Sequence, residues 1–253
     1  AILADVDRFA ALNEKPEALI VSGDLVQGVQ RGAVGFEKEM RGQYGVAFDL
    51  IGRLCEELLE GDRSRVVIVP GNHDVCWNTS ATAMEVVHDG NYPTNLRQAL
   101  AERDGEFRWS WNERKLYRVS NTNHYAQRLC SYWDGIEEFY RGVKLMLPVD
   151  RARGYHLFEL FNGNMLVAAF ESTHRNDHLR YEAELQTGVV SRCAMAIRKL
   201  GLTPALLAAV WHHSVSGAPD KEDYLNIETI RQLAGLGFQI GFHGHQHLAE
   251  STD

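Results

Sequence analysis

The sequence predicts an α/β fold in which strands and helices alternate along the chain. Five short apolar runs have strand character, and helical patterns lie between them. Each of these runs is followed at once by polar or charged residues. Strands that alternate with helices form layered folds in which the strands are mostly buried. We therefore expect a layered α/β domain with its polar residues gathered at the strand ends.

The elements follow in order from this pattern. Residues 1–18 have the apolar spacing of an amphipathic helix, with Ile2, Val6 and Phe9 on one side. The run ALLAAV would also suit a helix, but its place after KLGLTP favours a strand. The expected strands are ALIV (18–21), VVIV (66–69), MLVAAF (165–170), ALLAAV (205–210) and FQIGF (238–242).

Helical patterns occupy residues 47–61, 189–201 and 227–237, and the last two end in glycine, as helix C-caps often do. Residues 77–144 differ from the rest of the chain. They hold four of the five tryptophans and few strand-like runs, and NLRQALAERDGEF and GIEEFYRGVKLM look helical. We expect this stretch, the cap segment, to be a largely helical insertion between core strands.

Composition limits the class of protein. The 253 residues are 45% hydrophobic and 24% charged, which suits one large α/β domain or two small ones. The net charge of −8 argues against a protein that coats nucleic acid through overall charge, although a local basic groove remains open. The four cysteines are scattered, which excludes a zinc ribbon and favours reduced thiols in a cytoplasmic protein. No apolar run approaches the ~18 residues of a membrane-spanning helix, so no membrane partner is expected.

The residues that follow the strands are the most informative feature of the sequence. The carboxyl ends of strands in a layered α/β fold line one edge, where ligands bind. Histidine, aspartate and an amide oxygen are ligands suited to zinc, manganese or iron. The segments at the strand ends are SGD (22–24), GNHD (71–74), ESTH (171–174), WHHS (211–214) and HGHQH (243–247).

Each segment alone also has a structural explanation. A GD pair after a strand is usually a turn, and one histidine of an HH pair can simply pack in the core. The two histidines of GHQH are two residues apart, so in an extended segment they face the same way, which favours metal binding. Because all the segments occur together, each at a strand end, they indicate a metal site.

This set resembles the signature of the calcineurin-like metallophosphoesterase superfamily, which reads D-x-H, G-D, G-N-H-[DE], a later histidine (often H-H) and G-H-x-H. Four of the five motifs are present in order over residues 22–247. The resemblance implies a four-layer β-sandwich of two mixed sheets flanked by helices, with two divalent metal ions at one edge. Manganese is the metal we expect first, with iron, zinc and nickel as alternatives.

The resemblance also implies roles. Asp24 would bridge both metals, and His73 would contact the scissile phosphate and protonate the leaving oxygen. Two cations ~3.5–4 Å apart would lower the pKa of a bridging water, and the resulting hydroxide would attack phosphorus in line. The residues that would ligate metal are Asp24, Asn72, His212 and His245 at the first site, and Asp24 and His247 at the second.

Other residues near the motifs have less specific expectations. Asp74 either orients the catalytic His73 or caps the following helix. His213, the second residue of the HH pair, is expected to line the substrate pocket. His243 points away from the ligand face of a regular strand, so we expect a structural role.

The D-x-H motif does not occur before Asp24, where the family places it. Either the strand that carries it precedes residue 1, or one metal site is defective. The family order of strand, D-x-H, helix, strand and G-D favours the first explanation, because this chain begins on the helical pattern. We expect residues 1–253 to be one metallophosphoesterase domain that lacks its first and last strands within a longer polypeptide, whose further domains and oligomeric state are open.

The resemblance implies a phosphoester substrate, but the motifs do not identify its leaving group. The segment FRWSWNERKLYRV (107–119) mixes basic and aromatic side chains, which suits a nucleotide or single-stranded nucleic acid. An amphipathic hairpin whose aromatics pack on the core would explain the same composition. We expect a phosphodiesterase first, with Arg114 and Lys115 as substrate contacts and Arg108 and Arg118 also near phosphates.

Two alternatives remain open. One is a phosphomonoesterase that acts on a protein or small-molecule phosphate. The other, from a different class, is a metal-deficient scaffold or binding subunit, which a missing D-x-H motif would suit.

Overall fold

The strands of the core form two sheets. In the described part of the chain, residues 16–102, 104–217 and 223–246 of the computed structural model, the first sheet is a parallel pair, β1-β2, and the second has the order β11-β10-β7-β6. Strand β6 is antiparallel to β7, and the others run parallel. All five predicted strands are confirmed, and β6 is one that the pattern did not predict. Their bounds are β1 Leu19–Val21, β2 Val66–Ile68, β6 Tyr155–Leu160, β7 Met165–Phe170, β10 Leu206–Val210 and β11 Ile240–Phe242.

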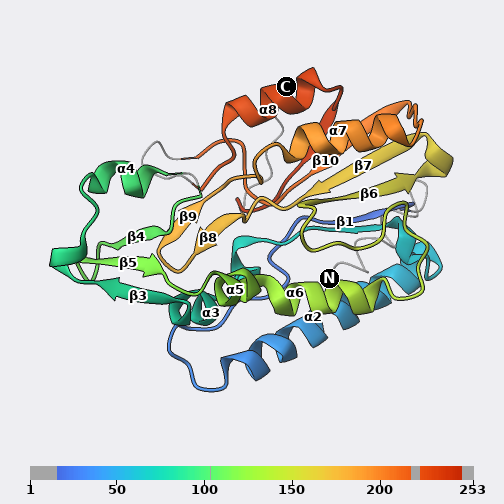
Figure 1. Cartoon of the computed structure of the whole chain (residues 1–253). Helices are drawn as coiled ribbons and strands as arrows, with labels where there is room; N and C mark the ends of the chain where they lie inside the picture. The colour runs from blue at the N-terminus through green and yellow to red at the C-terminus, as the bar shows by residue number, and fades with distance from the viewer. Residues whose placement is uncertain (1–15, 103, 218–222, 247–253) are drawn as a thin grey trace.

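Helices lie on both sides of these strands (Figure 1). Helices α7 and α8 lie on the side of the four-stranded sheet, and α2 and α6 lie on the side of β1 and β2. The three predicted helices are present, although α2 begins well before the predicted start. The helix predicted at residues 1–18 falls almost wholly outside the described residues. The bounds are α2 Phe36–Leu59, α6 Cys130–Phe139, α7 Val189–Lys199 and α8 Ile227–Gly235.

Strand β7, in the interior of the four-stranded sheet, is buried on both faces. Val167 and Ala169 belong to one hydrophobic cluster, which also contains β2 and the inner faces of α2 and α6. Leu166 and Ala168 belong to a second cluster, which contains α7 and α8. Because successive side chains of a strand point to opposite faces, β7 contributes to both clusters. This explains its near-continuous apolar sequence.

Within the described residues, the cap segment contains the expected helices together with a sheet that the pattern did not predict. It contains a three-stranded antiparallel sheet of order β3-β5-β4, and FRWSWNERKLYRV forms the β4–β5 hairpin. The strand period was hidden because the buried positions of β4 carry Arg108 and Ser110 instead of apolar residues. The bounds are α3 Trp77–Thr82, β3 Met84–Val87, α4 Leu96–Ala101, β4 Phe107–Ser110, β5 Lys115–Val119 and α5 Thr122–Ala126.

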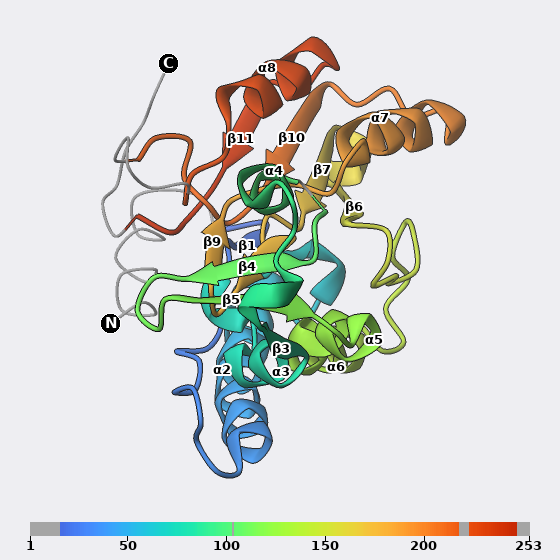
Figure 2. The same cartoon turned by 60° about the vertical axis from the view of Figure 1, so that its left-hand side comes forward.

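The last helix of this segment, α6, packs with the core. The rings of Phe139 and of Phe48 on α2 lie 5.7 Å apart. Gly135 lets the two helices approach, because a Cβ there would lie 2.2 Å from Cε2 of Phe48. The cap sheet projects from the core on the other side of α3 and α5, and Figure 2 shows it turned toward the viewer.

A short hairpin, β8 (Arg175–Asp177) and β9 (Arg180–Glu182), joins the end of β7 to the cap. Its Asp177 accepts a 2.7 Å hydrogen bond from Arg108 of β4, and both side chains are buried. All four cysteines are free, as expected. Among the described residues, no helix has the length and apolar character needed to cross a membrane.

Candidate metal centre and active site

Four of the predicted ligands lie together beyond the ends of β1, β2, β10 and β11. Nε2 of His212 is 2.9 Å from Oδ1 of Asn72, and Nδ1 of His245 is 3.0 Å from the same oxygen. The two ring nitrogens are 3.3 Å apart. Oδ2 of Asp24 is 3.4 Å from Nε2 of His212. Residues as far apart in the sequence as Asp24 and His245 thus converge at one edge, whereas His247 lies outside the described residues.

Glycines make this convergence sterically feasible. A Cβ at Gly23 would lie 2.4 Å from Nδ1 of His212, and a Cβ at Gly71 would lie 2.2 Å from Oδ1 of Asp24. Asp24 and His245 also have left-handed backbones, with φ of 54° and 70°. Such conformations are unfavourable for residues other than glycine and gather at functional sites. The SGD and GNHD motifs therefore need glycine because side chains of the site press against the backbone.

The hydrogen bonds of His212 define its tautomer. Its Nδ1 lies 2.7 Å from the carbonyl oxygen of Ser22, which can only accept, so Nδ1 carries the hydrogen. The ring is buried, and burial lowers its pKa, which favours the neutral form. Nε2 then presents a lone pair to the oxygens of Asn72 and Asp24. Three electron-rich atoms facing one another without a hydrogen between them suit a cation.

The residues present fit a divalent metal ion. Two imidazoles, a carboxylate and an amide oxygen are a donor set for zinc, manganese or iron. Within the described residues, no group of three or more His, Cys, Asp or Glu side chains could by itself hold a metal ion. The candidate metal site therefore depends on the amide oxygen of Asn72, which the rings of His212 and His245 both face.

His73 lies at the rim of this cluster. Its backbone N–H donates to Oδ1 of Asp24 at 3.0 Å. Its Nδ1 is 2.9 Å from the carbonyl oxygen of Gln27, so this nitrogen carries a hydrogen and Nε2 is left to give or take a proton. The side chain is exposed. Its position next to the ligands suits contact with a phosphate, and its role as a general acid stays a prediction.

Asp74 is buried and acts on the loops instead of on the His73 ring. Its carboxylate accepts from the N–H of Gly71 at 2.7 Å, the N–H of Leu25 at 3.3 Å and the hydroxyl of Tyr44 at 2.8 Å. Burial raises its pKa to about 7. The N-cap of α3 is Cys76, so neither role expected for Asp74 appears in these contacts. It clamps the GNHD loop onto the loop that follows Asp24.

His213 presents a hydrogen-bond donor beside the cluster. The hydroxyl of Ser172 accepts from the backbone N–H groups of His212 and His213, so its own hydrogen points to Nδ1 of His213 at 2.8 Å. Nε2 of His213 therefore carries the other hydrogen, and it has no partner among the described residues. The ring centroid lies 5.1 Å from that of His245. The side chain is fully buried, so the substrate contact stays a prediction.

Two residues near the ligands were not predicted. Oδ2 of Asp223 lies 3.5 Å from Nε2 of His245, so this carboxylate can orient the ring. Ser172 orients His213, as described above, and its only sequence signal was its place after β7. His243, in contrast, stacks on Trp211 with ring centroids 5.9 Å apart, which agrees with a structural role.

The basic residues of the cap separate into two groups. Arg108, which we expected near a phosphate, is buried and forms an ion pair with Asp177, so it does not lie exposed on the surface of the cap. Arg118 pairs with Glu85 at 2.6 Å on the surface. Arg114 and Lys115 are exposed at the turn of the β4–β5 hairpin.

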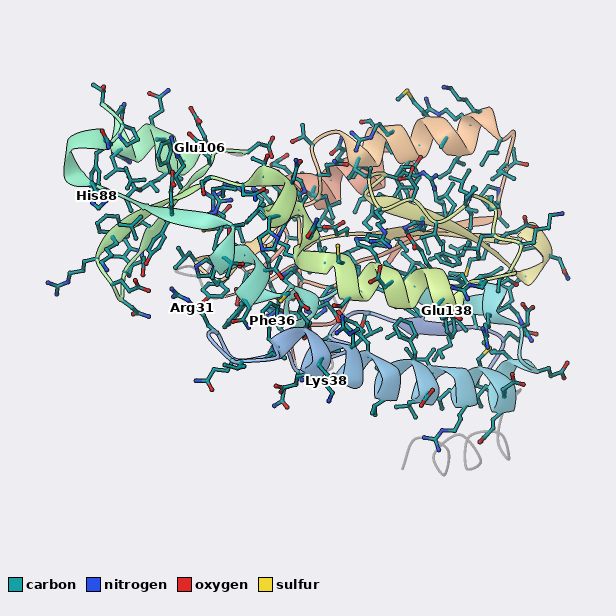
Figure 3. All side chains as sticks on the ribbon, turned by 60° about the horizontal axis from the view of Figure 1, so that its bottom comes forward. Arg31, Phe36, Lys38, His88, Glu106 and Glu138 are labelled. Carbon is teal, nitrogen blue, oxygen red and sulfur yellow. The ribbon has the colours of Figure 1, made fainter. Side chains whose placement is uncertain are left out.

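The hairpin turn is attached to the loop that follows Asp24. Glu113, next to Arg114, forms a 3.0 Å ion pair with Arg31 of that loop. In Figure 3, Arg31 lies on the side of Phe36 that faces the cap. Trp111 at the same turn is 84% exposed. The ion pair between Glu113 and Arg31 thus connects the cap to the loop that follows Asp24.

A donor set of this kind at the strand-end edge of an α/β fold is typical of metal-dependent hydrolases. The family model of the calcineurin-like phosphoesterases matches residues 1–249, and the chain belongs to this family. It is thus a metallophosphoesterase, a hydrolase of phosphoric ester bonds, and members of the family typically bind two divalent metal ions. A search of curated proteins finds no match.

Proposed function

We propose that this protein is a phosphodiesterase that acts on a nucleotide or nucleic acid with two bound divalent metal ions, manganese first. Membership in the calcineurin-like phosphoesterase family supports the hydrolysis of a phosphoric ester as the reaction. The observation that carries the metal site is the approach of His212 and His245 to one amide oxygen of Asn72, at 2.9 and 3.0 Å. We also propose that the two core sheets and the helices beside them form the four-layer sandwich of the family.

Asp24, Asn72, His212 and His245 would hold the metal ions, with His247 as a further ligand. When bound, the ions supply the Lewis-acid charge that stabilises the phosphoryl oxygens. The protein's other groups orient these ligands. The Ser22 carbonyl sets the tautomer of His212, as its 2.7 Å contact with Nδ1 indicates.

His73 would move the proton. Its Nδ1–H is held by the Gln27 carbonyl, so Nε2 is the nitrogen that would protonate the leaving oxygen. Asp74 holds the loop that carries His73 through its bonds to Gly71 and Leu25. The Nε2–H of His213 would donate to a phosphoryl oxygen.

The hairpin turn supports the choice of a nucleotide or nucleic acid. Trp111 is exposed there and can stack on a base, and Arg114 and Lys115 can neutralise flanking phosphates. The ion pair between Glu113 and Arg31 holds this turn against the loop that follows Asp24.

The test is the cleavage of bis-p-nitrophenyl phosphate and of p-nitrophenyl phosphate by the same preparation with manganese. We expect faster cleavage of the diester, together with metal-dependent cleavage of an oligonucleotide. A clear preference for the monoester would contradict the phosphodiesterase and favour the phosphomonoesterase. Metal analysis that finds no bound ion, with neither ester cleaved, would favour the metal-deficient scaffold.

A further inference from the structure

A cavity lies under the cap, along the strand-end edge of the four-stranded sheet that also carries the metal ligands. Its volume is about 540 Å³. Glu171, which follows β7, and Gly154, which precedes β6, line it. The metal ligands His212 and His245 instead follow β10 and β11, on the other side of β7 in the sheet. Ser172, the neighbour of Glu171, is fully buried and bonds His213, so buried protein separates the cavity from the metal cluster.

Arginines outnumber the acidic residues that line this cavity, although four of these arginines form ion pairs with carboxylates. Five arginines and three acidic residues line it. An arginine side chain stays protonated in proteins, and a buried charge is costly unless it is paired. Three of the five arginines are at least nine-tenths buried, namely Arg108, Arg128 and Arg180.

Arg128 has no carboxylate among its hydrogen-bond partners in the described structure. Its three hydrogen bonds go to the backbone carbonyls of Tyr125, His174 and Asn176. The guanidinium also lies over the Tyr125 ring, 4.3 Å from its centroid. Carbonyls and an aromatic ring carry no net charge, so these contacts orient the cation without neutralising it.

Arg180 is the arginine of this cavity that most clearly has a donor free to bind an anion. The residue is 7% exposed, and its Nη1 has no hydrogen-bond partner among the described residues. Its Nη2 donates to the carbonyl of Leu100 at 3.1 Å, and its Nε lies 3.4 Å from Glu182. Arg175, from the same β8–β9 hairpin, forms ion pairs with Glu182 and Glu184, and its buried Nε has no hydrogen-bond partner among the described residues. Unfilled donors of buried guanidinium groups are costly, and they are the groups that bind phosphate oxygens.

The rest of the cavity suits the body of an organic molecule. Val119, Leu129 and Trp133 give it an apolar wall. Small-molecule sites are typically ≈ 300–1,000 Å³ and mostly apolar, with a few placed polar groups. Burial raises the pKa of Glu171, and the positive charge of the neighbouring Arg128 opposes this shift.

We propose that this cavity binds a small organic phosphate, whose phosphate group pairs with Arg180 and the neighbouring arginines and whose apolar body lies against Trp133. The site is distinct from the metal cluster, and the inference does not rest on the proposed phosphodiesterase activity.

The experiment is a calorimetric titration of the full chain with phenylphosphonate, whose C–P bond resists hydrolysis by a phosphoesterase, and with inorganic phosphate. We expect one phenylphosphonate per chain and weaker binding of inorganic phosphate, which lacks the apolar body. Trp133 lies in the wall, so its fluorescence gives a second readout.

Variants on α5 test the location without removing a buried contact. Ala126 is exposed and lines the cavity, so Ala126→Glu places a negative charge at its mouth. We expect this change to weaken phenylphosphonate binding about tenfold or more, because the added carboxylate and the anionic probe repel each other. The matched control is Asn123→Glu on the same helix, which is exposed and outside the lining. Arg180→Met should also weaken binding, and Ala126→Glu decides the question if that variant does not fold.

A further variant separates this cavity from the metal cluster. Asp24→Asn should bind phenylphosphonate as the parent protein does. If Asp24→Asn loses the binding, the probe sits on the metal cluster and the proposal is overturned. Equal weakening by Asn123→Glu, or no binding at millimolar probe, overturns it as well. Absence of diesterase activity with this binding intact contradicts only the proposed function.

Discussion

The strand-end edge and the cap place their charged side chains by different rules. At the edge, Asp24, Asn72 and His212 each follow a strand, and their ligand atoms face one another within 3.4 Å. In the cap, basic residues that are close in the sequence have unrelated environments. Arg108 is buried against Asp177, whereas Arg114 is exposed at a turn. At the edge, a residue's place directly after a strand therefore predicts that its side chain belongs to the site. In the cap, the composition of a segment does not predict which of its charged side chains are exposed.

The largest expected effect follows from removing the carboxylate of the edge. Asp24→Asn should lower diesterase turnover about 10⁴-fold, because metal charge is worth several kcal/mol to the transition state and each 1.36 kcal/mol is a factor of ten. Metal content, measured on the purified variant, should fall in parallel. Full metal occupancy with full activity would contradict the role of Asp24 as a ligand.

Removing the imidazole at the rim should separate chemistry from metal binding. His73→Ala should lower turnover roughly 10²–10⁴-fold, the usual contribution of a general acid, with metal content unchanged. The reason is that the described contacts of the His73 ring go to Gln27 and not to a ligand. A loss of metal as large as that of Asp24→Asn would show that His73 belongs to the ligand set.

Within the cap, the buried and exposed arginines should differ in their contribution to stability. Arg108→Met leaves Asp177 buried without its cation, so the free energy of unfolding should fall by about 3–5 kcal/mol. Arg118→Met breaks only an exposed pair with Glu85, so the free energy of unfolding should change far less. Urea denaturation of both variants measures the difference. Equal losses would contradict the contrast drawn between the two groups.

The smallest expected effect concerns the hairpin turn. Charge reversal at Arg114 and Lys115 should raise KM for an oligonucleotide a few-fold, because exposed phosphate contacts are individually weak in salt. KM for bis-p-nitrophenyl phosphate, which is too small to reach the turn, should not change. The double variant Arg198→Glu with Lys199→Glu, at the exposed end of α7, is the matched control. The same rise in both variants would remove the hairpin from substrate recognition.

Much of the core could be predicted because its signals are local. A buried parallel strand such as MLVAAF is apolar throughout, and the glycine at the end of a helical pattern indicates where a helix stops. Strand β6 was missed because YHLFEL mixes polar and apolar residues without a clear period. The sequence of the β4–β5 hairpin suited both a substrate-binding segment and an amphipathic hairpin packed on the core. One of its inward positions is Arg108, whose partner Asp177 lies 69 residues further along the chain.

The sequence by itself determined the α/β class and the strand-end motifs, and the motifs indicated the family. The motifs can be recognised because the ligands and the close-packed glycines beside them must follow one another at fixed short spacings. Only the tertiary structure decided which donors share the oxygen of Asn72 and that Asp74 clamps loops. It also decided which arginines of the cap are buried, and that Nη1 of Arg180, beside a cavity, has no hydrogen-bond partner among the described residues. These properties depend on contacts between segments distant in the sequence, where burial and the partner set the state of each charge.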